Sequence, residues 1–230
     1  MATRFKIEET DRSCHLRHPR ERLTKNYVRK HVHKTTNDDT CRVCKSSKET
    51  IHHVISGCSV LAPTKYVQRH DNLCKYVHML LVQKYDLQTG DEKWYDPEPI
   101  LENDRVKILW NFPVQTDHTV RHNKPDILVF EKISRSAIII DIAIPADANI
   151  ARKRTEKIQN YSDLSFELKQ IWNVDKVMIV PVIIGATGII HKNFGEINNK
   201  LGVNLDIREA QKIVILGTVN ICRTFFQTNL

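Results

Sequence analysis

The chain has 230 residues, with 35 Lys and Arg against 27 Asp and Glu, and a formal net charge of +8. This length allows one or two small domains, and the positive charge favours a polyanionic partner such as nucleic acid. The first thirty residues are polar and basic, and the longest apolar run, 177–190, is broken by Pro181, Gly185 and Gly188. We therefore expect neither a signal peptide nor a membrane span, and an intracellular chain whose cysteines are reduced.

Residues 1–40 form a basic arm. Its Lys and Arg residues lie close together at Arg20, Arg22, Lys25, Arg29, Lys30 and Lys34. Such an arm can follow the phosphates of a nucleic acid. A solvated helix accounts for the same charges equally well, so the arm alone does not identify a partner.

Residues 41–62 contain four metal-ligand side chains at close spacing, namely Cys41, Cys44, His53 and Cys58. A Cys-x₂-Cys pair followed by His and Cys suits one tetrahedral zinc ion. His52 is the alternative to His53, and a set of free thiols near a loop is the alternative to a metal site. We expect a structural zinc knuckle that takes no direct part in chemistry.

Residues 63–230 are expected to form the main domain. Apolar residues at helical spacing predict a helix over 66–84, with Arg69, His70 and Asp71 near its start. An exposed polar turn is the simplest interpretation of these three residues. The polar segment 86–103, which contains two prolines, is expected to be a loop or linker, and 106–110 a strand.

Two short apolar runs, 127–130 and 137–144, are joined by a polar connection and predict a β-hairpin. If the turn centres between residues 133 and 134, Asp126 falls opposite Asp141. Directly opposed residues share one face of the sheet, with Cβ atoms about 5 Å apart. A shift of one residue would send the two side chains to opposite faces.

Asp141 is the one polar residue in its apolar run. A buried carboxylate is costly unless it is paired or coordinated, and a second carboxylate beside it raises one of the two pKa values. A hard divalent cation such as Mg²⁺ relieves both problems. We therefore expect Asp126 and Asp141 to be magnesium ligands.

A helix follows, with apolar residues at Ile150, Tyr161, Leu164, Leu168 and Ile171. Lys157 lies within this inward stripe and Lys153 at its edge, one turn earlier. A lysine here either extends along the sheet edge or points toward the carboxylates. We favour the second interpretation for Lys157, because the anomalous lysine and the anomalous acids converge on one location.

Further elements are a strand over 177–184, a short helix over 193–200 and a C-terminal helix over 207–226. Pro181 within the strand indicates either an edge strand or an early strand end. Gly217 in the last helix is expected to be a close packing contact. The predicted order is helix, strand, strand, strand, helix, strand. This α/β order, αβββαβ, is that of restriction-endonuclease-like folds.

Two acids and a lysine around a divalent cation are typical of phosphodiester cleavage. Pro-Asp, fourteen residues and then Asp resembles the PD-(D/E)xK nuclease superfamily. The usual lysine two residues after the second acid is Ala143 here. A lysine on the following helix, as at Lys157, is a known variation of that superfamily.

A wider set of segments, in order TCRVC, KETIHHVISGC, YVQRHD, ILWNFPVQTD, KPDILVFE, IIIDIAIPAD, EKIQNYSDL, PVIIGATG and QKIVILGT, resembles the C-terminal region of site-specific non-LTR retrotransposon polyproteins. There a zinc knuckle and a restriction-like endonuclease follow a reverse transcriptase. The endonuclease nicks target DNA, and the exposed 3′ end primes reverse transcription. The resemblance implies DNA as partner, with element RNA and a reverse transcriptase beside it, and a nuclear location.

Carried over residue by residue, the resemblance implies zinc ligands Cys41, Cys44, His53 and Cys58, catalytic residues Asp126, Asp141 and Lys157, and nucleic-acid contacts at Arg69, His70, Lys124, Lys153 and Tyr161. The cofactors implied are structural Zn²⁺ and catalytic Mg²⁺. Asn160 stands where the family often has Lys.

No reverse transcriptase palm motif and no amino-terminal DNA-binding fingers are found in the sequence. We therefore expect a fragment or remnant reading frame that nicks DNA but does not copy RNA. A non-catalytic nucleic-acid-binding remnant, using the zinc knuckle and the basic surface, is the alternative. A junction-resolving or repair nuclease of the same fold is a third hypothesis, although such enzymes lack this knuckle.

Overall fold

The computed structural model describes residues 25–87, 95–192 and 194–227. Its longer elements are α4 (Val67–Lys84), β2 (Val106–Trp110), β3 (Ile127–Glu131), β4 (Ser136–Ala143), α5 (Ile150–Asn160), α6 (Ser162–Ile171), β5 (Lys176–Ile183) and α8 (Ile207–Gln227). The shorter ones are α2 (Asn26–His31), α3 (Ile51–Ser56), β1 (Ile100–Glu102) and α7 (Glu196–Leu201), with a π-helical turn at Ala62–Tyr66 and a 3₁₀ turn at Asp147–Asn149. Within these residues no helix is long and apolar enough to cross a membrane.

The five strands form one mixed sheet in the order β1-β2-β3-β4-β5. Neighbouring strands from β1 to β4 are antiparallel, and β5 runs parallel to β4 after the crossover through α5 and α6. In the hairpin Ile127 pairs with Ile140. This register is the predicted one, and it places Asp126, one residue before β3, opposite Asp141.

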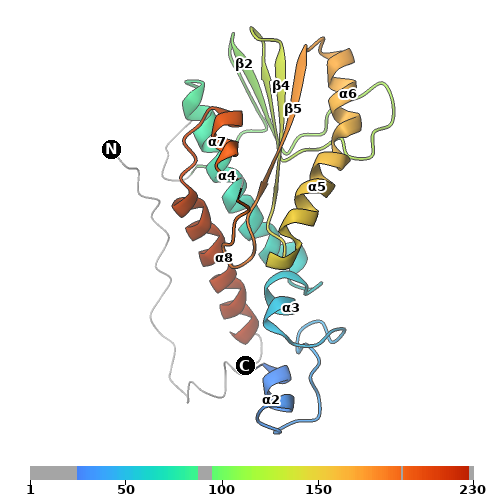
Figure 1. Cartoon of the computed structure of the whole chain (residues 1–230), viewed down its shortest axis with the longest axis vertical. Helices are drawn as coiled ribbons and strands as arrows, with labels where there is room; N and C mark the ends of the chain where they lie inside the picture. Colours follow the sequence, from blue (N-terminus) through green and yellow to red (C-terminus); the bar gives the residue numbers. More distant parts are fainter. Residues whose placement is uncertain (1–24, 88–94, 193, 228–230) are drawn as a thin grey trace.

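Helices cover both faces of the sheet (Figure 1). The face carrying Ile138, Ile140 and Ile142 packs in one core with α4 and α8. The opposite face packs Ile139 against Leu164 and other residues of α6. Because β4 is covered on both sides, its residues are buried from Ala137 to Ile142. Only a carboxylate with protein partners can be accommodated at Asp141.

Most predicted elements are confirmed to within a few residues, but two expectations are wrong. A short strand, β1, lies in the segment 86–103 that was expected to be a loop. The long helix after β4 is two helices, because the backbone of Tyr161 leaves the helical conformation at φ −101°, ψ 6°. No Gly or Pro marks this break, so no local signal could have predicted it.

Candidate functional site

Four metal-ligand side chains meet in the knuckle. The ligand atoms of Cys41, Cys44, His53 and Cys58 all lie within 4.8 Å of one another, and Cys44 Sγ lies 3.3 Å from His53 Nε2. His53 lies on α3, whose first turn is capped by Thr50, whereas His52 is exposed and outside the group. The group can hold a metal ion such as zinc, with His53 as its nitrogen ligand.

The thiols of this group differ in environment. Cys41 is fully buried, and this burial raises the pKa of its thiol to about 11. Although burial also disfavours the Cys44 thiolate, hydrogen bonds from Ser46 lower the pKa of Cys44 to about 6. Thiolate is the form that binds metal.

The knuckle rests on the C-terminal end of α8. Glu49 is fully buried and accepts from Arg42 Nη2 at 2.6 Å and from the Arg42 backbone at 2.8 Å. The Arg42 guanidinium lies 5.3 Å from the ring centroid of Phe225, and Cys41 shares a hydrophobic cluster with Phe225 and Ile221. The knuckle is thereby packed onto the main domain, as the position of α3 beside α8 shows (Figure 1).

The described part of the basic arm folds back on the knuckle. Asn26 Nδ2 donates to the carbonyl of Thr40 at 3.0 Å, and Lys30 and His31 each lie 3.1 Å from a carboxylate oxygen of Asp39. The backbone N–H of Asn26 also donates to Glu49 Oε1 at 2.8 Å, and this contact ties α2 to the knuckle across the expected boundary at residue 40. The basic residues Arg20 and Arg22 lie outside the described residues.

A second group gathers where β3 begins and β4 ends. Asp141 is 2% exposed. Its Oδ1 accepts from the Tyr161 hydroxyl at 2.7 Å, and its Oδ2 lies 2.7 Å from Lys157 Nζ. Despite this short ion pair, Oδ2 has no well-directed hydrogen bond from any described residue. The carboxylate is thus buried and charge-paired, with an oxygen left to accept a further partner.

Burial and the neighbouring Asp126 carboxylate raise the pKa of Asp141, against the opposing effect of Lys157. The structure therefore confirms the expected conflict between two adjacent acids. Lys157 reduces that conflict without removing it, so a cation placed between the acids would be attracted to both.

Asp126 is held by two contacts. Its Oδ2 accepts from the backbone N–H of Ile142 at 2.6 Å and lies 3.3 Å from His70 Nε2. His70 Nδ1 lies 3.0 Å from Asp71 Oδ1. Burial disfavours the imidazolium, but the Asp126 carboxylate outweighs it and raises the pKa of His70. His70 therefore orients Asp126, and Asp71 orients His70.

His70, Cys74 and Asp126 also bring their ligand atoms within 4.8 Å of one another. Cys74 is buried on the same helix, one turn after His70. The family resemblance implied that His70 contacts nucleic acid. The His70–Asp126 contact was missed because it joins residues far apart in the chain, and no local pattern reports such a pairing.

The two lysines of α5 differ. Lys157 points inward to Asp141, which confirms the interpretation of the inward stripe. Lys153 lies 2.6 Å from Glu156 on its own helix and makes no ion pair with either acid among the described residues. Lys124 is exposed two residues before the first acid, where contact with a ligand is sterically open.

Two residues expected to contact nucleic acid are buried instead. Arg69 is 2% exposed, donates to Thr218 Oγ1 at 2.7 Å and lies against Gly217, where a Cβ would come within 2.6 Å of its Cγ. This confirms Gly217 as a close packing contact, and it makes Arg69 an interhelical residue between α4 and α8. Tyr161 is 5% exposed and holds Asp141, so neither side chain is available to nucleic acid in this structure.

The site therefore combines two adjacent carboxylates, a lysine and a tyrosine on one of them, and a histidine on the other. Such a group can hold a hard cation and place positive charge beside a phosphate. No protein-family model matches the chain, and no curated protein matches it at a significant level.

Proposed function

We propose that this chain is a metal-dependent DNA endonuclease domain of the restriction-like type, which nicks target DNA for reverse transcription primed at the nick. The observation that carries the proposal is the pairing of Asp126 opposite Asp141 with Lys157 Nζ 2.7 Å from Asp141 Oδ2. The two carboxylates and the lysine come from the start of β3, from β4 and from α5. Such a combination suits phosphodiester cleavage. The proposed place of action is the nucleus, beside a reverse transcriptase and the element RNA.

The donor set fits Mg²⁺, because the oxygens of Asp126 and Asp141 are hard ligands and Asp141 Oδ2 lacks a directed hydrogen bond. When bound, the ion would supply charge neutralisation on a phosphate and a lowered pKa of a water. Asp126 and Asp141 would hold it. Lys157 favours the ionised form of Asp141 and offers positive charge to the phosphate, and Tyr161 fixes the Asp141 rotamer through its hydroxyl.

The order of elements supports the restriction-like assignment. α4, then β2, β3 and β4, then α5 and α6, then β5 gives helix, three antiparallel strands, a helical crossover and a parallel strand. β1 adds one strand at the far edge, away from both acids. In this proposal α4 contributes His70, which contacts Asp126, and α5 contributes Lys157, which pairs with Asp141.

We assign the knuckle a structural role. Its four ligands fill a tetrahedral coordination sphere and leave no position for a substrate. Its packing on α8 and the fold-back of α2 bring basic residues, Arg29 and Lys34 among them, to the same end of the molecule. A zinc ion there would stabilise this arrangement.

A nucleic-acid-binding module without catalysis is the second candidate, and one observation favours it. Lys157 and His70 already pair with the two acids, so the network is charge-compensated by the protein itself. In this alternative the acids are structural, and binding depends on the knuckle and the basic surface.

The test is nicking of supercoiled plasmid by the purified chain in Mg²⁺ and Mn²⁺. Asp141→Asn keeps the shape and the Tyr161 hydrogen bond but removes the charge, and Asp163→Asn changes an exposed acid on α6 as the matched control. The proposal predicts nicking by wild type and by the control, and none by Asp141→Asn. Salt-sensitive binding with no nicking in either ion selects the second candidate.

A further inference from the structure

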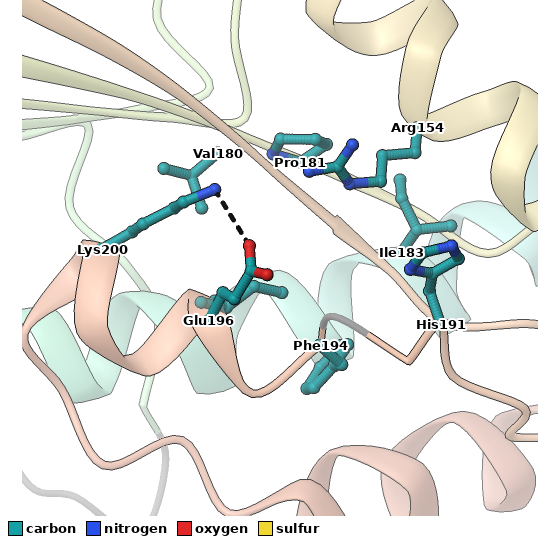
Figure 2. A pocket seen from close by; sticks show the side chains of 9 residues that line it. Arg154, Val180, Pro181, Ile183, His191, Phe194, Glu196 and Lys200 are labelled. Atoms are coloured by element: carbon teal, nitrogen blue, oxygen red, sulfur yellow. Dashed lines mark ion pairs between the residues drawn. The ribbon is translucent and has the colours of Figure 1, made fainter.

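A hollow at the free edge of the sheet is not used by the proposed chemistry. It lies along β5, which ends the sheet, and its empty volume of about 370 Å³ includes open solvent. Figure 2 shows three basic side chains around it: Arg154 from α5, His191 from the segment after β5, and Lys200 from α7. A hollow that is open to solvent suits a passing chain better than an enclosed small-molecule ligand.

The hollow is close to the candidate acids. Pro181, which lines it, is the register partner of Asp141 on the neighbouring strand, about 4.8 Å away in a sheet. Arg154 lies three residues before Lys157, about 4.5 Å along the helix axis. DNA carries one phosphate per about 3.4 Å of axis in each strand. A strand with one phosphate at the acids would therefore bring a neighbouring phosphate to this edge.

Charge at the hollow is positive but partly compensated. Lys200 Nζ lies 3.6 Å from Glu196 Oε2, the ion pair drawn in Figure 2. No described carboxylate lies within ion-pair distance of Arg154, whereas Arg152 on the same helix pairs with Glu156 at 3.5 Å. Arg154 is thus the basic group at this edge with the most freedom to take an anion.

The floor of the hollow disfavours a protein partner that adds a strand. Pro181 lies in the edge strand, and a proline there lacks the N–H that strand addition uses. The other apolar residues that line the hollow are all buried, so each offers little apolar surface: Val180, Ile183, Phe194 and Ile197. A flexible polyanion needs neither feature.

We propose that Arg154, with Lys200 and His191, binds a backbone phosphate of the DNA strand that crosses the candidate acids, next to the phosphate to be cut. This inference rests on the proposed function and adds to it a subsite that binds the backbone of the DNA strand. Phosphate contacts fix register without reading sequence. The subsite would therefore hold the strand in place irrespective of its base composition.

Fluorescence anisotropy of a labelled DNA duplex with the full chain tests the subsite, in Ca²⁺ to separate binding from cleavage, over a series of salt concentrations. Arg154→Ala and Lys200→Ala are expected to weaken binding about three- to tenfold and to lower the slope of log affinity against log salt by about 1. Arg152→Ala, the same residue type on the same helix, is expected to change both by less than half as much. Arg154→Lys, which restores the charge, checks that any loss is not misfolding.

Equal effects of Arg154→Ala and Arg152→Ala, an unchanged salt slope, or no DNA binding by wild type would each overturn the subsite. So would a dimer that Arg154→Ala dissociates without changing DNA affinity, which would assign this edge to a second copy. Plasmid nicking separates the two proposals. Nicking that depends on Asp141 but not on Arg154 removes only the subsite, and Arg154-dependent binding without nicking removes only the nuclease.

Discussion

Lys157 on α5 lies 2.7 Å from a carboxylate oxygen of Asp141, a residue that is 2% exposed in the middle of a covered sheet. A strand interior normally excludes such a charge. The lysine offsets part of the cost of burying it, and the tyrosine at the junction of α5 and α6 fixes its orientation. The break between these two helices is therefore directly connected to the candidate site.

The pair is expected to be strongly coupled in stability. Lys157→Met alone leaves a buried carboxylate without its cation, and we expect a loss of about 1–3 kcal/mol in the free energy of unfolding. Asp141→Asn with Lys157→Met removes both charges, and the double variant should recover most of that loss. Urea unfolding of the four proteins measures the coupling. Additive effects would show that the pair does not interact.

His70 is expected to act on metal affinity more than on the maximal rate. His70→Ala frees the Asp126 carboxylate to rotate, so more Mg²⁺, about tenfold, should be needed for half-maximal nicking. The maximal rate at saturating Mg²⁺ should change less. His52→Ala, an exposed histidine of the knuckle helix, is the control. An unchanged Mg²⁺ requirement in His70→Ala would show that His70 does not position Asp126.

The sequence predicted the features that depend on neighbouring segments of the chain, but not the contacts between distant elements. The hairpin register followed from two apolar runs and a polar turn, and it placed the acids correctly. The inward position of Lys157 was predicted because a charged side chain within the apolar stripe of a helix is unusual. The burial of Arg69 and Tyr161 was not foreseen, because their partners Gly217, Thr218 and Asp141 lie on other elements, and no local pattern reveals a tertiary contact.

The knuckle should contain one zinc ion per chain, measured by elemental analysis. His53→Ala is expected to lose that zinc and to lower the unfolding temperature, since structural zinc contributes directly to folding. His52→Ala should keep it, because His52 lies outside the ligand group. Retained zinc in His53→Ala and loss in His52→Ala would reverse the assignment.

The contact between α4 and α8 should tolerate no added volume at Gly217. Gly217→Ala places a Cβ 2.6 Å from Arg69 Cγ, where the buried guanidinium leaves little room to move, and should destabilise the chain by about 1–3 kcal/mol. Gly195→Ala is the matched control, since nothing lies within 4 Å of an added Cβ there. Equal stability of the two variants would mean that Arg69 can shift without cost.

Glu131 should make the stability sensitive to acid. Although burial opposes ionisation, hydrogen bonds from Tyr85 and Ser134, with Lys84 nearby, lower the pKa of Glu131 below its value in the unfolded chain. A lowered carboxyl pKa contributes stability that is present above the unfolded pKa and is lost as the pH falls through the folded pKa. Below about pH 4.5, wild type should therefore lose more stability than Glu131→Gln. Parallel profiles of the two proteins in thermal unfolding would contradict this.

The most direct measurement is the initial rate of nicking of supercoiled plasmid as a function of Mg²⁺ concentration, for wild type and Asp126→Asn. We predict a rate that rises and saturates with Mg²⁺ in wild type and stays at background in the variant, whose folding is checked by circular dichroism. A rate that survives in Asp126→Asn, or that does not depend on a divalent cation, would contradict the assignment of the paired acids as a metal-dependent nuclease site.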